Sequence, residues 1–368
     1  MDEKSTDISK NGFKLISKYR AVIMGLAAIW IHIYHVWIHT LRNPATGFGT
    51  VMSNVESYIV TIGNCGVDIF FLMSGMGLVY AIRKEPLRKF YYRRIRRVYF
   101  PFLIAAILSA VFEKWSFTTF LGNVSGYSFY VKDINTYCWF VPAVITLYLF
   151  FPLYYLVFNK TKKKLVCTAV ALLAWLLLNI LLTDVMRFDL FGFYNRIPVF
   201  LIGIFFGYMA QSREDLVFKA KHYVLLIFLF IASLVLLYIY KFRYFSVLLT
   251  QEKLVVPAIP LAVSYPFLVA KVMDILERRI PGFGKALNTV LSFWGKISLE
   301  MYLIYTCFLV TFFSPIVLFI RSYKIPPFFI NLIVFCITSV LAWLLYMACS
   351  YFFKLVGLIG KRRESAES

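Results

Sequence analysis

The fold is decided by residues 59–97, where the run IVTIGNCGVDIFFLMSGMGLVYAI (59–82) is followed at once by RKEPLRKFYYRRIRR (83–97). The first segment has 24 residues and a single charged one, Asp68, so it is long and apolar enough to cross a bilayer as a helix. The second segment carries eight Lys and Arg, and such basic flanks stay on the cytoplasmic side of a membrane. Together they predict a membrane-spanning helix that ends in the cytoplasm.

The composition of the whole chain extends this interpretation. Of its 368 residues, 61% are hydrophobic and only 15% are charged, and the mean hydropathy is +0.76. Soluble domains carry about 25% charged residues, so an ordinary soluble protein and a disordered chain are both excluded. The net charge of +21 would favour a nucleic-acid partner in a soluble protein. Here the basic residues lie between apolar runs, so we expect a lipid bilayer and no nucleic acid as partner.

Nine more apolar runs resemble 59–82 in length or composition. The ten predicted spans are 21–39, 59–82, 98–112, 138–158, 165–183, 196–210, 222–240, 254–270, 297–319 and 327–350. They predict an all-α fold, a polytopic membrane bundle of about ten transmembrane helices.

The distribution of basic residues predicts the orientation of these spans. With the N-terminus in the cytoplasm, 29 of the 39 Lys and Arg fall in cytoplasmic segments, and each cytoplasmic segment holds at least three. The positive-inside rule then places both termini in the cytoplasm. The predicted organisation is a tail at 1–20, a transmembrane domain at 21–353 and a second tail at 354–368.

Three of the four histidines share one helical face of the first span. His32, His35 and His39 are three and four residues apart. Ionisable residues inside a membrane usually face a cavity or the protein interior, which favours a function for His35. His32 fits a structural and a functional role equally well, and His39 marks the predicted outer boundary. A metal site needs more ligands than this face offers, so no metal is predicted.

Two carboxylates also lie within or near predicted spans. Asp68 needs a partner, and two interpretations stand: a histidine on a neighbouring helix, or a cap on a broken helix near the outer surface. Gly63, Gly66, Gly75 and Gly77 flank it, and small residues let helices approach closely. Glu300 follows Lys296 near a cytoplasmic helix end, where we expect an exposed salt bridge.

The basic run at 83–97 also has two interpretations. It is a positive-inside anchor against anionic lipid, or it binds a phosphorylated ligand. Arginine binds phosphate with a bidentate fork, and the interleaved Phe90, Tyr91 and Tyr92 would stack on an adenine ring. Further on, Trp139 and Phe140 suit an outer aromatic belt.

Five motifs occur in an order that resembles the bacterial membrane acyltransferase-3 family. They are RAVIMGLAAIWIHIYH (20–35), GVDIFFLMSGMGLVY (66–80), FYYRRIRRVYFPFLI (90–104), CWFVPAVITLYLFFPLYY (138–155) and GKISLEMYLI (295–304). The resemblance covers about residues 18–310. It implies transfer of an acyl group, often acetyl, from cytoplasmic acyl-CoA to a hydroxyl of a carbohydrate or another cell-envelope acceptor. It also implies the bacterial cytoplasmic membrane as location, acyl-CoA as donor substrate and no permanently bound cofactor.

The resemblance also assigns residues. The family's first-span arginine matches Arg20, and its essential histidine matches His35. The family's cytoplasmic arginine motif matches Arg93, Arg94 and Arg97, so the resemblance implies that these three residues bind the donor. His35 follows Arg20 by fifteen residues, a longer spacing than in the commoner form, so His32 stays a rival. The family often has histidine where this chain has Tyr305, so no catalytic role is carried over there.

The predicted catalytic set is therefore His35, His32 and Asp68, with His35 as general base or as transient acyl carrier. Two other classes of function fit the same residues. In a secondary transporter, His35 and Asp68 would form a proton relay. In a membrane scaffold or sensor, the arginines would only bind lipid.

Overall fold

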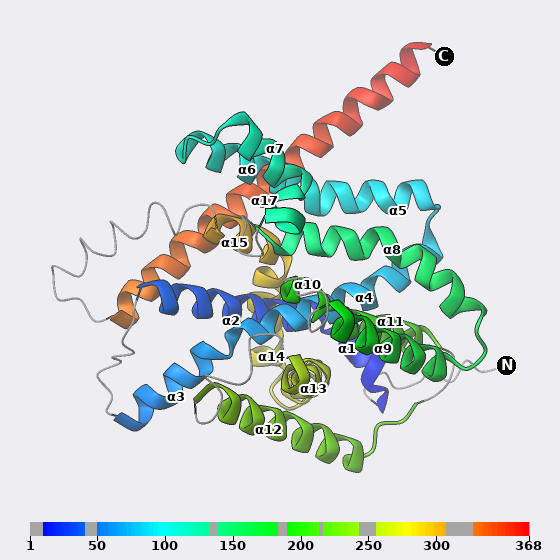
Figure 1. Ribbon diagram of the computed structural model, residues 1–368, viewed down its shortest axis with the longest axis vertical. Coiled ribbons are helices and arrows are strands. Elements are labelled where there is room, and N and C mark those ends of the chain that lie inside the picture. Colours follow the sequence, from blue (N-terminus) through cyan, green and yellow to red (C-terminus); the bar gives the residue numbers. More distant parts are fainter. Residues whose placement is uncertain are drawn as a thin grey trace.

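The protein is described by a computed structural model that covers residues 10–40, 50–132, 138–182, 190–212, 216–242, 255–306 and 327–367. These residues form helices and short helical turns, with no strand among them. A helix satisfies its own backbone hydrogen bonds, which the bilayer interior demands. The predicted all-α membrane bundle is confirmed (Figure 1).

The structure describes the following helices, given in chain order. Up to residue 180 they are α1 (Gly12–Lys18), α2 (Arg20–Thr40), α3 (Thr50–Thr61), α4 (Gly66–Lys84), α5 (Leu87–Arg94), α6 (Phe100–Phe112), α7 (Phe117–Ser125), α8 (Phe140–Lys160) and α9 (Lys164–Ile180). After it they are α10 (Phe191–Tyr194), α11 (Ile197–Gln211), α12 (Ala220–Phe242), α13 (Val255–Arg279), α14 (Pro281–Lys296), α15 (Ser298–Ile304) and α17 (Pro327–Glu367).

The described helices account for most of the predicted spans. Six of them are long and apolar enough to cross a membrane, and α1 with α2, which meet at 70°, make a seventh if they count as one bent span. The apolar helices α9 and α11 are shorter. Residues 307–319 of the ninth predicted span lie outside the described residues. The total of ten spans and the cytoplasmic termini stay predictions.

The arginine run is helical, whereas the third span was predicted to begin only at residue 98. Helix α5 begins after Pro86 and continues through a π-helical turn at Ile95–Tyr99 into α6. Proline suits a helix start, and Leu, Arg and Lys favour helix. Pro101 has no N–H for the usual backbone hydrogen bond, and the π turn lies just before it. The arginines therefore project from a continuous helix of 26 residues, Leu87–Phe112.

Helix α14 was not predicted, because residues 271–296 were assigned to a cytoplasmic segment. The structure packs α14 closely against α2, with Gly25 of α2 and Gly295 of α14 at the contact. A Cβ on Gly25 would overlap the carbonyl oxygen of Leu291, and one on Gly295 would overlap that of Ala21. Small residues at both positions let the two backbones touch.

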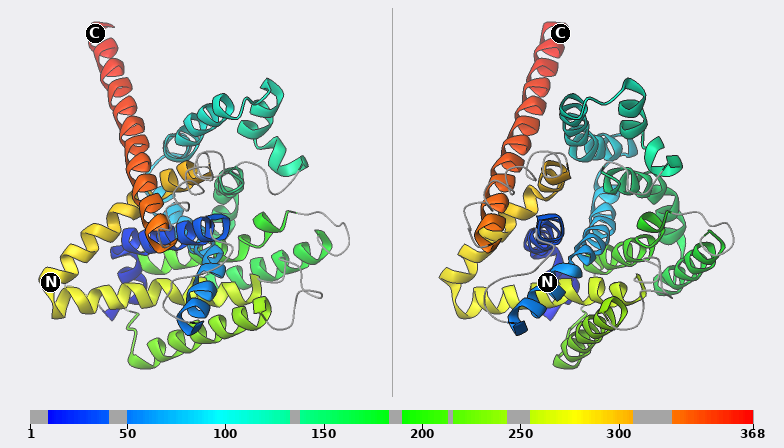
Figure 2. Two further views of the ribbon diagram at one scale, coloured as in Figure 1. Left: turned by 90° about the vertical axis from the view of Figure 1, so that its left-hand side faces the viewer. Right: turned by 60° about the vertical axis from the view of Figure 1, so that its left-hand side comes forward.

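Helix α4 lies between α2 and α11 in the centre of the molecule (Figure 1). Glycines make this close packing possible. Gly66 faces the carbonyl of Ala27 in α2, and Gly75 faces the carbonyl of Phe200 in α11. This confirms the expected role of the glycines around Asp68. In both views of Figure 2, α17 (orange to red) extends away from this packed centre toward the C-terminus.

Candidate active site

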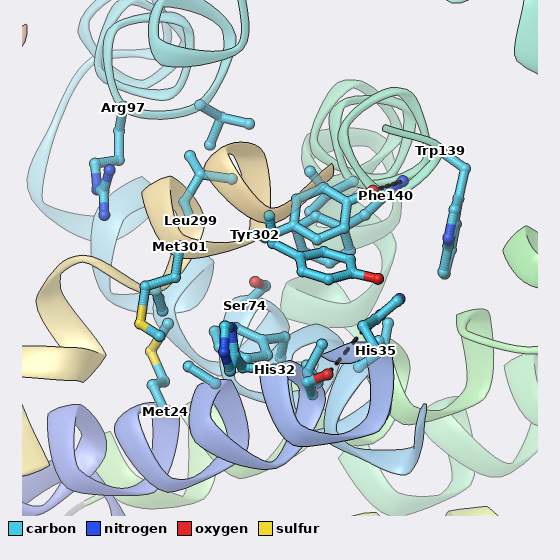
Figure 3. Close-up of a pocket in the computed structure, with 18 of the residues that line it drawn as sticks. Met24, His32, His35, Ser74, Arg97, Trp139, Phe140, Leu299, Met301 and Tyr302 are labelled. Atoms are coloured by element: carbon cyan, nitrogen blue, oxygen red, sulfur yellow. Dashed lines mark hydrogen bonds between the residues drawn. The ribbon is translucent and has the colours of Figure 1, made fainter. Parts of the chain in front are cut away.

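A cavity of about 180 Å³ lies between α2, α4, α8, α15 and the junction of α5 with α6. Its walls are mostly apolar, with basic and aromatic side chains among them (Figure 3). The lining residues are Arg20, Met24, Ala28, Ile31, His32, His35, Val67, Phe70, Ser74, Arg94, Arg97, Val98, Trp139, Phe140, Val144, Tyr148, Ser298, Leu299, Met301, Tyr302 and Tyr305.

Helix α2 lines this cavity along most of its length. Arg20, Met24, Ala28, His32 and His35 lie on one face because they are three or four residues apart. At about 1.5 Å per residue, the backbone of His35 lies about 22 Å beyond that of Arg20. The structure thus brings the predicted Arg20, His32 and His35 to one cavity.

His35 is held in a defined orientation at the far end of that face. Its Nδ1 lies 2.9 Å from the carbonyl oxygen of Ile31, which can only accept, so Nδ1–H donates. In the neutral ring the lone pair then belongs to Nε2. The ring centroid lies 4.6 Å from that of Tyr305, another cavity residue. This tautomer suits a base or a nucleophile that acts through Nε2.

His32 lies one turn before His35, in different surroundings. Only 4% of the residue is exposed, and neither ring nitrogen has a hydrogen-bond partner in the described part of the chain. Its ring contacts the edges of Phe335 and Tyr305, at centroid distances of 5.2 and 6.1 Å. The third histidine, His39, belongs to α2, but its side chain lies outside the described residues.

Two arginines in the cavity wall lack a carboxylate partner within the described ranges. Arg20 donates from Nη2 to the carbonyl of Met73 at 3.2 Å and lies against Gly77, where a Cβ would overlap the guanidinium. The guanidinium of Arg94 lies 5.3 Å from the ring centroid of Phe90 and 5.9 Å from that of Tyr148. Both retain a buried Nε without a described hydrogen-bond partner. Their charges can therefore attract an anion into the cavity.

Arg97 also lines the cavity, but it is bound to a carboxylate. It makes a bidentate pair with Glu300, in which Nη2 lies 3.2 Å from Oε2, and donates to the carbonyl of Lys296 at 2.7 Å. Glu300 is fully buried. The expectation of an exposed salt bridge at Glu300 is therefore wrong, because helix packing buries this carboxylate against the arginine run.

Arg93 is the third predicted arginine of the run and lies elsewhere. Its side chain is about half exposed and pairs with Glu85, and it does not line the cavity. Arg93 and Arg94 are adjacent on a helix, so their side chains point in directions about 100° apart. The structure brings Arg94 and Arg97 to the cavity, and a role for Arg93 in donor binding stays a prediction.

Asp68 is almost fully buried but is not part of the cavity wall. It lies in the first turn of α4, just after the short turn at Gly63–Cys65, and its Oδ1 lies 3.1 Å from Nε of Arg196. An acidic side chain is favourable at a helix N-terminus. The structure therefore gives Asp68 the position of a carboxylate at the start of a broken helix, with an arginine and not a histidine as its ionic partner. Its catalytic role stays a prediction.

Several cavity residues were not predicted as site residues. Trp139 and Phe140 were assigned to an outer aromatic belt, and Tyr148 and Tyr302 were not singled out, yet all four line the cavity. Figure 3 shows Trp139 beside His35, with Tyr302 on the opposite wall from α2. Aromatic residues are frequent throughout this chain, at 19%, so their type alone gave no signal of the site.

Comparison with known proteins identifies the family of the chain. The family model for the acyltransferase domain of the acyltransferase-3 type matches residues 22–347, a range that includes both cavity histidines and the arginine run. No curated protein and no solved structure matches the chain significantly. The matched range covers most of the chain and most of its apolar helices. The chain therefore belongs to the acyltransferase-3 family and is a multi-pass membrane acyltransferase.

Proposed function

We propose that this protein transfers an acyl group, acetyl in the first instance, from acyl-CoA to a hydroxyl of a carbohydrate or another cell-envelope acceptor. One observation carries the proposal. One cavity within the bundle has two cations without a described carboxylate partner, Arg20 and Arg94, toward one end and an oriented histidine at the other. Figure 3 shows Met24, His32 and His35 in order along α2, with Arg97 toward the Met24 end.

The cationic end suits the donor. Coenzyme A is an anion, and Arg20 and Arg94 offer charge that no described carboxylate neutralises. At about 180 Å³ the cavity is smaller than the roughly 300–1,000 Å³ of most small-molecule pockets. It suits the acyl group and part of the pantetheine arm, with the nucleotide outside near the exposed part of the arginine run. The length of α2 between Arg20 and His35 matches such an extended arm.

His35 supplies the chemistry at the other end. As a base, its Nε2 takes the proton of the acceptor hydroxyl while that oxygen attacks the thioester carbonyl carbon. The C–S bond breaks, and the proton passes to the leaving thiolate, which yields an ester and free coenzyme A. As an acyl carrier, Nε2 attacks the thioester carbonyl carbon, the C–S bond breaks and the thiolate of coenzyme A leaves. The acceptor hydroxyl then attacks the acyl-imidazole, the C–N bond breaks to restore His35, and the hydroxyl proton passes to the thiolate. The Nδ1–H bond to Ile31 is compatible with both routes.

The membrane setting follows from the same arrangement. We place the protein in the bacterial cytoplasmic membrane, with the donor bound from the cytoplasmic side, where the arginine run is expected. The acceptor then meets the acyl group at the His35 end of α2.

The test compares strains of the source bacterium that carry the wild-type gene, no gene, His35→Ala or His222→Ala. His222 opens α12 and lies outside the cavity wall, so it is a matched histidine control. Mass spectrometry of surface glycans, with and without mild alkali, reports ester-linked acyl groups. We expect these groups in the wild type and in His222→Ala, and their loss in the other two. Identical glycans in all four strains, together with a failure of the purified protein to bind acetyl-CoA, would contradict the proposal.

A further inference from the structure

His32 is a buried polar group in the wall of the cavity of the proposed reaction, and it has no hydrogen-bond partner among the described residues. We propose that His32 donates a hydrogen bond to the carbonyl oxygen of the acyl thioester and stabilises the negative charge that forms there. This inference rests on the proposed function and names the group that binds the reacting carbonyl. It is separate from the role of His35.

The position of His32 along α2 matches the carbonyl of a bound donor. His32 lies about 18 Å beyond Arg20 and about 4.5 Å before His35 along the helix axis. A donor whose anionic part lies near Arg20 and Arg94 extends its thioester along this face toward His35. When the carbonyl carbon is within reach of a hydroxyl held at His35, its oxygen lies at the level of His32.

The ring nitrogens of His32 are available for a hydrogen bond to such a ligand. Both Nδ1 and Nε2 are buried, and neither makes a hydrogen bond to any described residue. A buried polar group without a partner is unfavourable, so a ligand that fills the cavity and accepts a hydrogen bond is favoured there. One nitrogen of a neutral imidazole always carries a proton, so a donor is present whichever tautomer forms.

The apolar surroundings increase the value of this hydrogen bond. Phe335 and Tyr305 pack against the ring in T-shaped contacts. Met24, Ala28 and Met301 also line the cavity. In apolar surroundings a fixed hydrogen-bond donor stabilises a developing oxyanion more than it would in water. The donor also needs no reorganisation during the reaction. In the transition state the carbonyl oxygen gains charge while the acceptor oxygen bonds to the carbon. It loses that charge when the C–S bond breaks, so His32 gains or loses no proton overall.

The experiment uses the purified full-length protein and acetyl-CoA labelled with ¹³C at the carbonyl. Isotope-edited infrared spectroscopy reports the carbonyl stretch of the bound thioester. A His35→Ala background keeps the thioester intact during the measurement. His32→Phe keeps an aromatic ring without a donor, whereas His32→Asn and His32→Gln keep an N–H. His222→Phe is the matched control, because His222 lies outside the cavity wall.

We expect the bound carbonyl to absorb at lower frequency than free acetyl-CoA in the His35→Ala protein and with His222→Phe. The shift should vanish in His32→Phe and return in at least one amide variant. With His35 intact, and envelopes of the deletion strain as acceptor, His32→Phe should lower kcat about 10²-fold. The KM for acetyl-CoA should change far less, and the pH profile should keep its shape because His35 remains.

Three results would overturn the inference. One is a bound carbonyl without any shift, and another is a full shift in His32→Phe protein that elutes and melts like the wild type. The third is an unchanged kcat in that variant. If the wild-type protein binds no acetyl-CoA at all, the proposed function fails together with this inference. If acetyl-CoA binds but its carbonyl is unshifted, only the role of His32 fails.

Discussion

The two cavity histidines lie one turn apart on α2 and yet have different surroundings. His35 donates to the Ile31 carbonyl within its own helix, which fixes both its ring orientation and its tautomer. His32 packs against Phe335 and Tyr305 in T-shaped contacts and has no described hydrogen-bond partner. The ring of His35 is therefore oriented for the proposed proton or acyl transfer, whereas the ring of His32 is available to bind a ligand atom.

His35→Ala should abolish acyl transfer, because it removes the only imidazole in the cavity wall whose Nδ1 is held by a described hydrogen bond. Loss of a general base lowers the rate by about 10²–10⁴. The measurement is transfer of radiolabel from acetyl-CoA to envelope acceptor by purified protein. His39→Ala should do little, since His39 falls near the predicted outer end of the span. Normal activity in folded His35→Ala would show that another group does the chemistry.

Arg94→Ala should raise the KM for acetyl-CoA, because Arg94 supplies cavity charge that no described carboxylate neutralises. The loss of one charge-assisted contact to an anion corresponds to about tenfold or more in affinity. Arg279→Ala, at an exposed position at the end of α13 and outside both the arginine run and the cavity wall, is the matched control and should leave KM unchanged. The assay varies acetyl-CoA at constant acceptor. Equal KM values in both variants would identify the run as a lipid anchor only.

Arg97→Ala should destabilise the protein more than Glu300→Gln does. The first change leaves a fully buried carboxylate without its cation, at up to about 3 kcal/mol, whereas the second leaves a cation whose side chain is 41% exposed and can be hydrated. Melting temperatures of the two variants in one detergent provide the comparison. The reverse order of stability would show that the pair is not buried as described.

At the scale of elements, glycines determine how closely neighbouring helices pack. The α2–α14 and α4–α11 pairs each meet where glycines on both helices face the partner's backbone. Without a strong hydrophobic force between helices in lipid, such close backbone contact is a main source of association. These contacts position α2 and α4, which hold a large part of the cavity wall.

Gly203→Ala should weaken the α4–α11 contact, because its Cβ would overlap the carbonyl oxygen of Leu72, a backbone atom that cannot move aside alone. Overpacking of this kind typically costs about 1–3 kcal/mol. Gly282→Ala is the control, since nothing lies within 4 Å of a Cβ there. Thermal unfolding in detergent should show a lower Tm only for the first variant. An unchanged Tm for Gly203→Ala would contradict the close approach of the two helices.

At the scale of the whole molecule, the helices present many apolar side chains outward and enclose the cavity, whose wall includes Arg20, His32 and His35. Exposed large apolar residues occur along α8, α9, α12 and α17, as expected where helices face lipid. The cavity lies inside this shell. The proposed donor end of α2 at Arg20 and the proposed acceptor end at His35 lie on opposite sides of the membrane if α2 crosses it.

Cysteine labelling before and after α8 tests the predicted topology of the bundle. In a variant with its own cysteines replaced, Lys162→Cys between α8 and α9 should react with an impermeant maleimide only after the membrane is opened. Asn123→Cys in α7 should react in intact spheroplasts. The reason is the bias of basic residues, 29 of 39 on the predicted cytoplasmic side. Reaction of both positions from one side would contradict the ten-span topology.

The sequence by itself determined the class of protein, the apolar runs that became helices and the shared face of His32 and His35. These properties depend on local periodicity and composition, which a single segment contains. Only the tertiary structure decided that Arg94 and Arg97 reach the cavity while Arg93 pairs with Glu85, and that Asp68 pairs with Arg196. Arg97 and Glu300 are 203 positions apart, and α14 meets α2 from the other end of the chain. Such partners depend on which helices pack together, and that choice depends on side-chain shape across helices that no single segment encodes.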